Sequence, residues 1–135
     1  MARVRAPVIA NGDIVDATSA RSALHLSGAA GIMIGRGAQG RPWVLAQIAA
    51  ALYGTPKVAA PGLGDLVDVV GAHYQDMLAF YGPDLGVRIA RKHLGWYIDA
   101  ANGPRGLRAQ LMRERDPELV LRALPDALAP QKDAA

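Results

Sequence analysis

Glycines and polar residues follow two short apolar runs, residues 8–10 and residues 32–34, near the start of the chain. These residues are Asn11, Gly12 and Asp13 after the first run, and Gly35, Arg36 and Gly37 after the second. Asn11 and Asp13 carry side chains that can reach a ribityl chain or a phosphate, and Arg36 adds a positive charge. Glycine lets a ligand come close to the backbone, and N–H groups around such turns bind anions.

The spacing of the two runs predicts how they are positioned. Short apolar runs of this kind are typical of buried parallel strands, and residues 17–27 between them are long enough for one crossover helix. Both glycine turns then lie at the carboxyl end of the sheet, where barrel and doubly wound folds bind ligands. Pro42 suits the first turn of a following helix. Each turn alone could be an ordinary strand end, but the pair at crossover spacing favours a phosphate site.

The rest of the chain predicts a helical domain. Five glycines and prolines between residues 53 and 64 indicate a linker. From Asp65 an apolar stripe at helical spacing extends to a Gly82-Pro83 stop; its members are Leu66, Val69, Val70, His73, Met77, Phe80 and Tyr81. Further helices are expected from about Val87 to Ala101, from Pro104, and from Pro117 with Asp116 as its cap. Four helices with short loops would form a small bundle.

The helix expected over residues 87–101 has two different faces. Ile89, His93, Trp96, Tyr97 and Ala100 would pack into the bundle, and Arg88, Arg91, Lys92, Gly95 and Asp99 share the opposite face. The basic face is either simply solvated or a phosphate-binding surface. His73 is expected in the core and His25 on a helix surface. Arg113 and Arg115 are assigned to solvent.

Composition limits the classes of function. The chain has 135 residues, is 51% hydrophobic and carries a formal net charge of +3. Its positive charge is concentrated where the motifs lie, since residues 84–115 contain seven basic and three acidic residues. We expect no disulfide and no metal site, because cysteine is absent and the three histidines lack ligand spacing. No secretory leader and no apolar run of about 18 residues is found, so a cytoplasmic protein without a membrane span is expected.

Four motifs in this order resemble the C-terminal part of bacterial tRNA-dihydrouridine synthases. They are VIANGDI (8–14), GIMIGRGAQGRPW (31–43), Tyr81-Gly82-Pro83, and RIARKH (88–93) with Trp96-Tyr97. The resemblance implies an FMN-binding (β/α)8 barrel followed by a helical domain that helps to hold tRNA. Residues 8–14 and 31–37 would be the seventh and eighth barrel strands with their loops. By motif, FMN contacts would come from Asn11, Gly12, Asp13, Gly35 and Arg36, and tRNA contacts from Arg88, Arg91 and Lys92.

The resemblance also implies what this chain does not contain. A complete barrel takes about 250 residues, so about six strands would belong to a missing N-terminal portion. In the family, NADPH reduces FMN, the flavin passes hydride to a uridine of tRNA, and a cysteine protonates the neighbouring carbon. That cysteine, with a lysine and a histidine near the flavin, would lie in the missing portion. We therefore assign no catalytic residue here, and we expect the isolated chain to be inactive.

The predicted fold class is an α/β remnant of a TIM barrel, with two parallel strands and their helices, followed by an all-α bundle. The predicted division is barrel portion 1–52, linker 53–64, helical tRNA-binding domain 65–128 and flexible tail 129–135. Two alternatives remain open: a stand-alone, non-catalytic RNA-binding helical module, and a fragment of another FMN barrel oxidoreductase. Strand endings like these occur in several flavin barrels, whereas the RIARKH helix favours the synthase.

Overall fold

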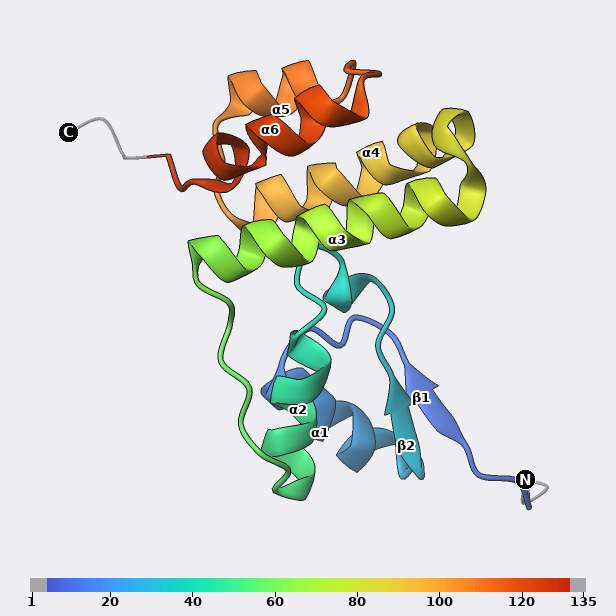
Figure 1. Ribbon diagram of the computed structural model, residues 1–135. Helices are drawn as coiled ribbons and strands as arrows, with labels where there is room; N and C mark the ends of the chain where they lie inside the picture. The colour runs from blue at the N-terminus through green and yellow to red at the C-terminus, as the bar shows by residue number, and fades with distance from the viewer. Residues whose placement is uncertain (1–4, 132–135) are drawn as a thin grey trace. The chain divides into compact units, whose positions relative to one another are not determined.

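The computed structural model describes residues 5–131, so residues 1–4 and the last four residues of the predicted tail lie outside the described part. The chain divides into two compact units, one up to Ala60 and one from Pro61 onward. The first contains two strands with their helices and the second contains only helices (Figure 1). The predicted fold class, a parallel strand pair with helices followed by a helical bundle, is confirmed.

The first unit contains one strand–helix–strand crossover. Strand β1 (Ile9–Asn11) pairs in parallel with β2 (Gly31–Met33), with Ile9 opposite Gly31 and Asn11 opposite Met33. Helix α1 (Ala17–Ser27) connects them and lies beside the strand pair (Figure 1). Both strands therefore end at the same edge, as the glycine spacing predicted.

Local signals set the bounds of α1. The Asp16 side chain caps its start by accepting a hydrogen bond of 2.7 Å from the Ser19 N–H, and Ser19 Oγ accepts one from the Asp16 N–H in return. Gly28 ends the helix with φ of 61°, a left-handed conformation that glycine adopts without strain. These capping residues stabilise α1, the helix that connects the two parallel strands.

A short 3₁₀ turn and a second helix complete this unit. The turn η1 (Arg36–Ala38) follows β2, and helix α2 (Val44–Tyr53) begins two residues after the predicted start at Pro42. Ile14, Ala20, Val44 and Ile48 form the buried core. Ile9 and Met33 remain exposed on the two strands, as does Val8 just before β1, so the pair presents apolar surface.

The second unit is the predicted helical bundle. Its helices are α3 (Leu63–Tyr81), α4 (Pro83–Ala100), α5 (Arg105–Leu111) and α6 (Pro117–Leu128). Helices α3 and α4 run side by side in opposite directions, and α6 packs against both (Figure 1). The most deeply buried large side chains are Tyr74, Leu94, Ile98, Leu111, Leu124, Leu128, Val70 and Val120. Asp116 caps α6 as predicted, since its side chain accepts from the Glu118 N–H.

The predicted packing face of the helix around residues 87–101 is only partly right. Tyr97 is buried as predicted, whereas Ala100 is exposed, and Leu94 and Ile98, which were not predicted, are buried.

Two details of the helix bounds and stripe are also wrong. Helix α4 begins at Pro83, four residues before the predicted Val87, because proline fits the first turn of a helix. Gly82-Pro83 is therefore the junction of two helices. The apolar stripe of α3 also ends early: Phe80 is 81% exposed and Tyr81 is exposed, while the core position between Val70 and Met77 is filled by Tyr74. The bundle covers the middle of α3 and leaves Phe80 and Tyr81 at its end exposed.

Candidate functional site

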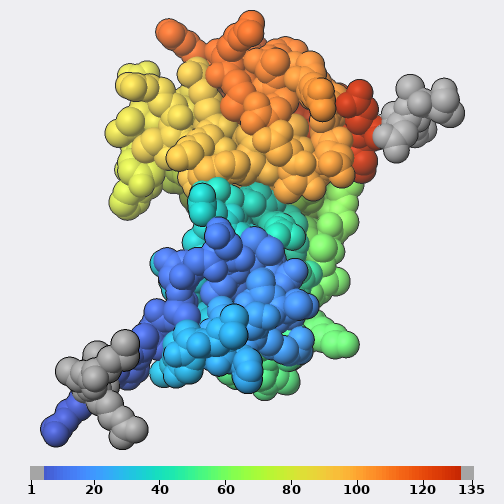
Figure 2. All heavy atoms as spheres, turned by 180° about the vertical axis from the view of Figure 1, so that it is seen from behind, coloured from blue at the N-terminus to red at the C-terminus, as the bar shows by residue number. Residues whose placement is uncertain are grey.

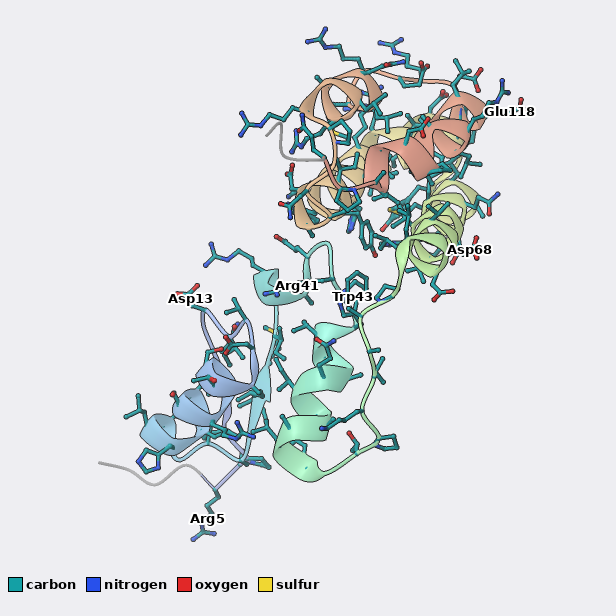
Figure 3. All side chains as sticks on the ribbon, turned by 90° about the vertical axis from the view of Figure 1, so that its left-hand side faces the viewer. Arg5, Asp13, Arg41, Trp43, Asp68 and Glu118 are labelled. Atoms are coloured by element: carbon teal, nitrogen blue, oxygen red, sulfur yellow. The ribbon has the colours of Figure 1, made fainter. Side chains whose placement is uncertain are left out.

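The loops after β1 and β2 enclose a hollow of about 740 Å³ within the first unit. Its lining residues are Asn11, Gly12, Asp13, Ile14, Val15, Gly35, Arg36, Gly37, Gln39 and Arg41. All five residues that the sequence analysis assigned to a phosphate ligand are among them. Figure 3 shows Asp13 on the loop after β1 and Arg41 on the loop after β2, at the same end of the strand pair.

The backbone around this hollow needs its glycines. Gly12 has φ of 135° and the following Asp13 has φ of 47°, so the β1 loop turns through conformations that most residues avoid. Gly37 lies so close to the Ile14 carbonyl that any Cβ there would overlap the oxygen. At Gly12 and Gly35, by contrast, a Cβ would meet no atom within 4 Å. The missing side chains of these two glycines therefore leave space inside the hollow.

Two arginines bring positive charge to the hollow. Arg36 Nη2 lies 3.1 Å from Asp13 Oδ1, and the two side chains are 84% and 91% exposed. An ion pair this exposed contributes little stability, so Arg36 can turn toward a ligand at small cost. Arg41 Nη2 donates to the Val15 carbonyl at 3.1 Å, which holds this side chain across the β1 loop. Arg41 and Gln39 were not predicted as site residues, although Arg41 stands next to Pro42 in the motif of residues 31–43.

A second hollow, of about 420 Å³, lies within the helical unit. Its lining residues are Pro83, Asp84, Val87, Arg88, Arg91, Arg115 and Pro117. Arg88 and Arg91 belong to α4. Figure 2 shows the side of the helical unit on which atoms of α4 and α5 are exposed. Arg115 lies in the loop between α5 and α6. It was assigned to bulk solvent, but it lines the same hollow as Arg88 and Arg91. Arg113 lies outside this hollow.

The three basic residues of α4 have different surroundings. Arg88 is exposed. Arg91 is half-buried, and its Nη2 donates to the Glu114 carbonyl at 3.0 Å. Lys92 is exposed, with Nζ 5.1 Å from the centre of the Trp96 ring, a cation–π contact. The face predicted to be basic is thus partly covered by α5. Its Arg108 side chain lies close to Gly95 and forms an ion pair of 2.6 Å with Asp99.

The histidines take structural positions. His73 of α3 shares a hydrogen bond of 3.2 Å with the Tyr97 hydroxyl, and its ring lies 5.1 Å from that of His93. Burial lowers the pKa of His93, with His73 and Lys92 adding to the effect, so its neutral form is favoured. Burial raises the pKa of Tyr97. His25 is exposed on α1, as expected.

Within residues 5–131, no three side chains of His, Cys, Asp or Glu gather in a way that would hold a metal ion. None of the helices in this part of the chain is long and apolar enough to cross a membrane.

Fold and site together define an α/β unit whose parallel strands end at an arginine-lined, glycine-rich hollow, followed by a helical bundle with basic surface. The family model described as dihydrouridine synthase (Dus) matches residues 1–132, and the chain belongs to this family.

Several curated relatives are similar to this chain. A probable tRNA-dihydrouridine synthase of Rhodobacter capsulatus is 56% identical over 134 residues, which is 99% of this chain and 40% of the relative. One of Rickettsia conorii is 44% identical over 84% of this chain and 34% of its own length. The tRNA-dihydrouridine synthase B of Pseudomonas putida is 43% identical over 79% of this chain and 32% of its own length. The chain thus spans about 40% or less of the relatives that it matches.

Proposed function

We propose that this chain is the C-terminal part of an FMN-dependent tRNA-dihydrouridine synthase, an oxidoreductase that reduces uridine to 5,6-dihydrouridine in tRNA with NADPH. The observation that carries the proposal is the hollow at the strand ends. Five residues, predicted from two separate motifs, line that one hollow. The names and lengths of the relatives support the activity and the assignment to part of a longer enzyme.

The residues around the hollow fit the phosphate end of FMN. Gly12 and Gly35 leave open space where any other residue would place a Cβ. Arg36 and Arg41 bring two guanidinium groups to the same hollow, and arginine binds phosphate with two parallel hydrogen bonds. A phosphate dianion would release Arg36 from its exposed pair with Asp13 and gain a better-matched partner.

The polar side chains after β1 suit the ribityl chain. A carboxylate and an amide oxygen accept hydrogen bonds from hydroxyl groups, and the Asn11 amide can also donate. Asp13 would repel a phosphate, so we place it beside ribityl hydroxyls and keep Arg36 and Arg41 for the phosphate. Gly37 keeps the two loops close, because a larger residue would collide with the Ile14 carbonyl.

The flavin, when bound, supplies the hydride chemistry, and the protein positions it. We assign no catalytic residue in this chain and give its residues binding and orientation. The family resemblance assigns the proton donor to a cysteine, and this chain contains none, so we place the donor in another part of the enzyme. We therefore propose that the isolated chain does not reduce uridine.

The helical unit would bind tRNA close to the target uridine. Extruding a base costs a few kcal/mol, which contacts elsewhere on the RNA must offset. Arg88 and Lys92 are exposed on α4 and can contact phosphates, which position an RNA without reading its sequence. Such a substrate places the working enzyme in the cytoplasm.

A chimaera tests the proposal. This chain replaces the matching segment of the Rhodobacter capsulatus relative, which is 56% identical to it. The chimaera and the isolated chain are each incubated with unmodified tRNA, FMN and NADPH, and dihydrouridine is measured by mass spectrometry of nucleosides. We expect product from the chimaera and none from the isolated chain. A folded, flavin-free and inactive chimaera would contradict the proposal, and turnover by the isolated chain would contradict the assignment of the catalytic groups elsewhere.

A further inference from the structure

Three arginines converge on the hollow of the helical unit, and they are not equivalent. Arg91 is half-buried and is engaged with the Glu114 carbonyl at 3.0 Å. Its Nε is buried without a hydrogen-bond partner. Arg88 and Arg115 are exposed, and neither is a partner in any of the ion pairs found among the described residues. The exposed guanidinium groups of the hollow therefore belong to Arg88 and Arg115.

The hydrogen bond from Arg91 fixes the loop that carries Arg115. Glu114 is the residue directly before Arg115, so an α4 side chain holds the α5–α6 loop at its backbone. The carboxylate of Glu114 turns back onto the same loop, accepting from the N–H groups of Arg115 at 2.7 Å and Asp116 at 2.9 Å. The backbone next to Arg115, which is one of the residues that line the hollow, is therefore held in place.

Two nearby carboxylates, those of Glu114 and Asp116, are not among the groups that line the hollow. Glu114 is occupied by backbone N–H groups, and Asp116 caps α6 through the Glu118 N–H at 2.9 Å. Asp84 is the one carboxylate among the residues that line the hollow, against three arginines. The residues that line the hollow therefore carry a net positive charge.

We propose that Arg88 and Arg115 bind one backbone phosphate of the RNA between them, and that Arg91 is a positioning residue that holds Arg115 in place. This inference rests on the proposed function for the identity of the RNA. Two guanidinium groups from different elements can surround a single phosphodiester, whose two free oxygens each accept hydrogen bonds. The RIARKH motif alone would assign Arg91 to the RNA and leave out Arg115, which lies 22 residues beyond the motif's last residue.

The test is the affinity of this 135-residue chain for unmodified tRNA, measured by fluorescence anisotropy at several salt concentrations. The variants are Arg88→Ala, Arg115→Ala and the double variant, with Arg113→Ala as the matched control on the same loop. Each of the first two should weaken binding roughly three- to tenfold at low salt and lower the salt slope by about one unit. The deficit of each should then shrink roughly threefold between about 50 and 200 mM salt. Arg113→Ala should bind as the unchanged chain does.

A shared phosphate has a second signature. Once Arg88 is gone, removing Arg115 should cost much less than it does alone, because the two act on one contact. For the positioning role, Arg91→Ala should lower the salt slope as Arg115→Ala does, and adding Arg115→Ala should lower it no further. A variant that merely unfolded the bundle would change the circular dichroism spectrum, which is recorded for each variant.

Four results would overturn the inference. The first is normal tRNA binding by Arg115→Ala, and the second is full additivity of the two substitutions. The third is no measurable tRNA binding by the unchanged chain. The fourth comes from titrating the same variants with inorganic phosphate: a loss of phosphate binding without a loss of tRNA binding would indicate a free-phosphate site. Failure of the proposed function gives a different pattern. The chimaera would then make no dihydrouridine while the variant series on tRNA kept its order.

Discussion

Replacing Gly86 with alanine should destabilise the helical unit, although alanine favours helices. A Cβ at Gly86 would lie 2.8 Å from Leu78 Cα and 2.9 Å from the Met77 carbonyl oxygen. Both atoms belong to the α3 backbone, so no side-chain rotation relieves the overlap and the two helices must separate. Overpacking of this kind costs about 1–3 kcal/mol, and the alanine preference returns roughly 0.5–1 kcal/mol. We expect a net loss of about 1–2 kcal/mol, or a fall in Tm of roughly 5–10 °C.

Gly71→Ala is the matched control, because it makes the same chemical change inside α3. There a Cβ would lie 3.7 Å from Leu124 Cδ1 and 3.8 Å from Leu121 Cδ2, which is ordinary contact distance. The change should raise stability by roughly 0.5–1 kcal/mol. Both variants are melted in a Trp43→Phe background, in which Trp96 fluorescence reports on the bundle alone. A Gly86→Ala protein as stable as its parent would refute the close crossing of α3 and α4 on which the placement of Arg88 depends.

Three further outcomes follow from the structure. In the 135-residue chain, hydrogen exchange should be slow in residues 65–127 and faster in residues 8–37, because two strands alone leave unpaired edges; equal protection would contradict this. Since the pKa of His93 is lowered in the folded state, its contribution to stability is complete above about pH 6.5 and is lost as the pH falls below that. His93→Gln should therefore flatten the pH dependence of the urea midpoint between pH 7.5 and 5, and an unchanged dependence would contradict this. Asp16→Ala removes the cap of α1, so amides in its first turn should exchange faster with those of α6 unaffected.

The strand–helix–strand crossover could be predicted because its signals are local. The apolar runs ending at Asn11 and Gly35 marked β1 and β2, and their spacing left room for α1. Convergence of both loops on one hollow followed from the parallel arrangement alone. Arg41 was missed because its position depends on the turn after β2. Its side chain donates a hydrogen bond to the Val15 carbonyl, 26 residues earlier in the chain, and such a contact has no local sequence signal.

The helical surface was predicted less well, for a physical reason. Periodicity assigns residues to faces of one helix, but it does not say which face a later helix covers. Arg91 appeared exposed from its own helix, and the contact that half-buries it comes from Glu114, 23 residues away. Arg115 has no periodic signal, since it lies in a loop. The start of α4 was misplaced because Gly-Pro both ends one helix and begins the next.

Flavin retention by the chimaera tests the central claim most directly, because it needs no turnover. The chimaera is purified with excess FMN and desalted, and bound flavin per protein is read from its absorbance. Arg36→Gln and Arg41→Gln are compared with Lys57→Gln, which removes an exposed charge outside the hollow. We predict near-stoichiometric FMN in the chimaera and in Lys57→Gln, with a clear loss in both arginine variants. Full FMN retention by Arg36→Gln and Arg41→Gln together would contradict the assignment of this hollow to the flavin phosphate.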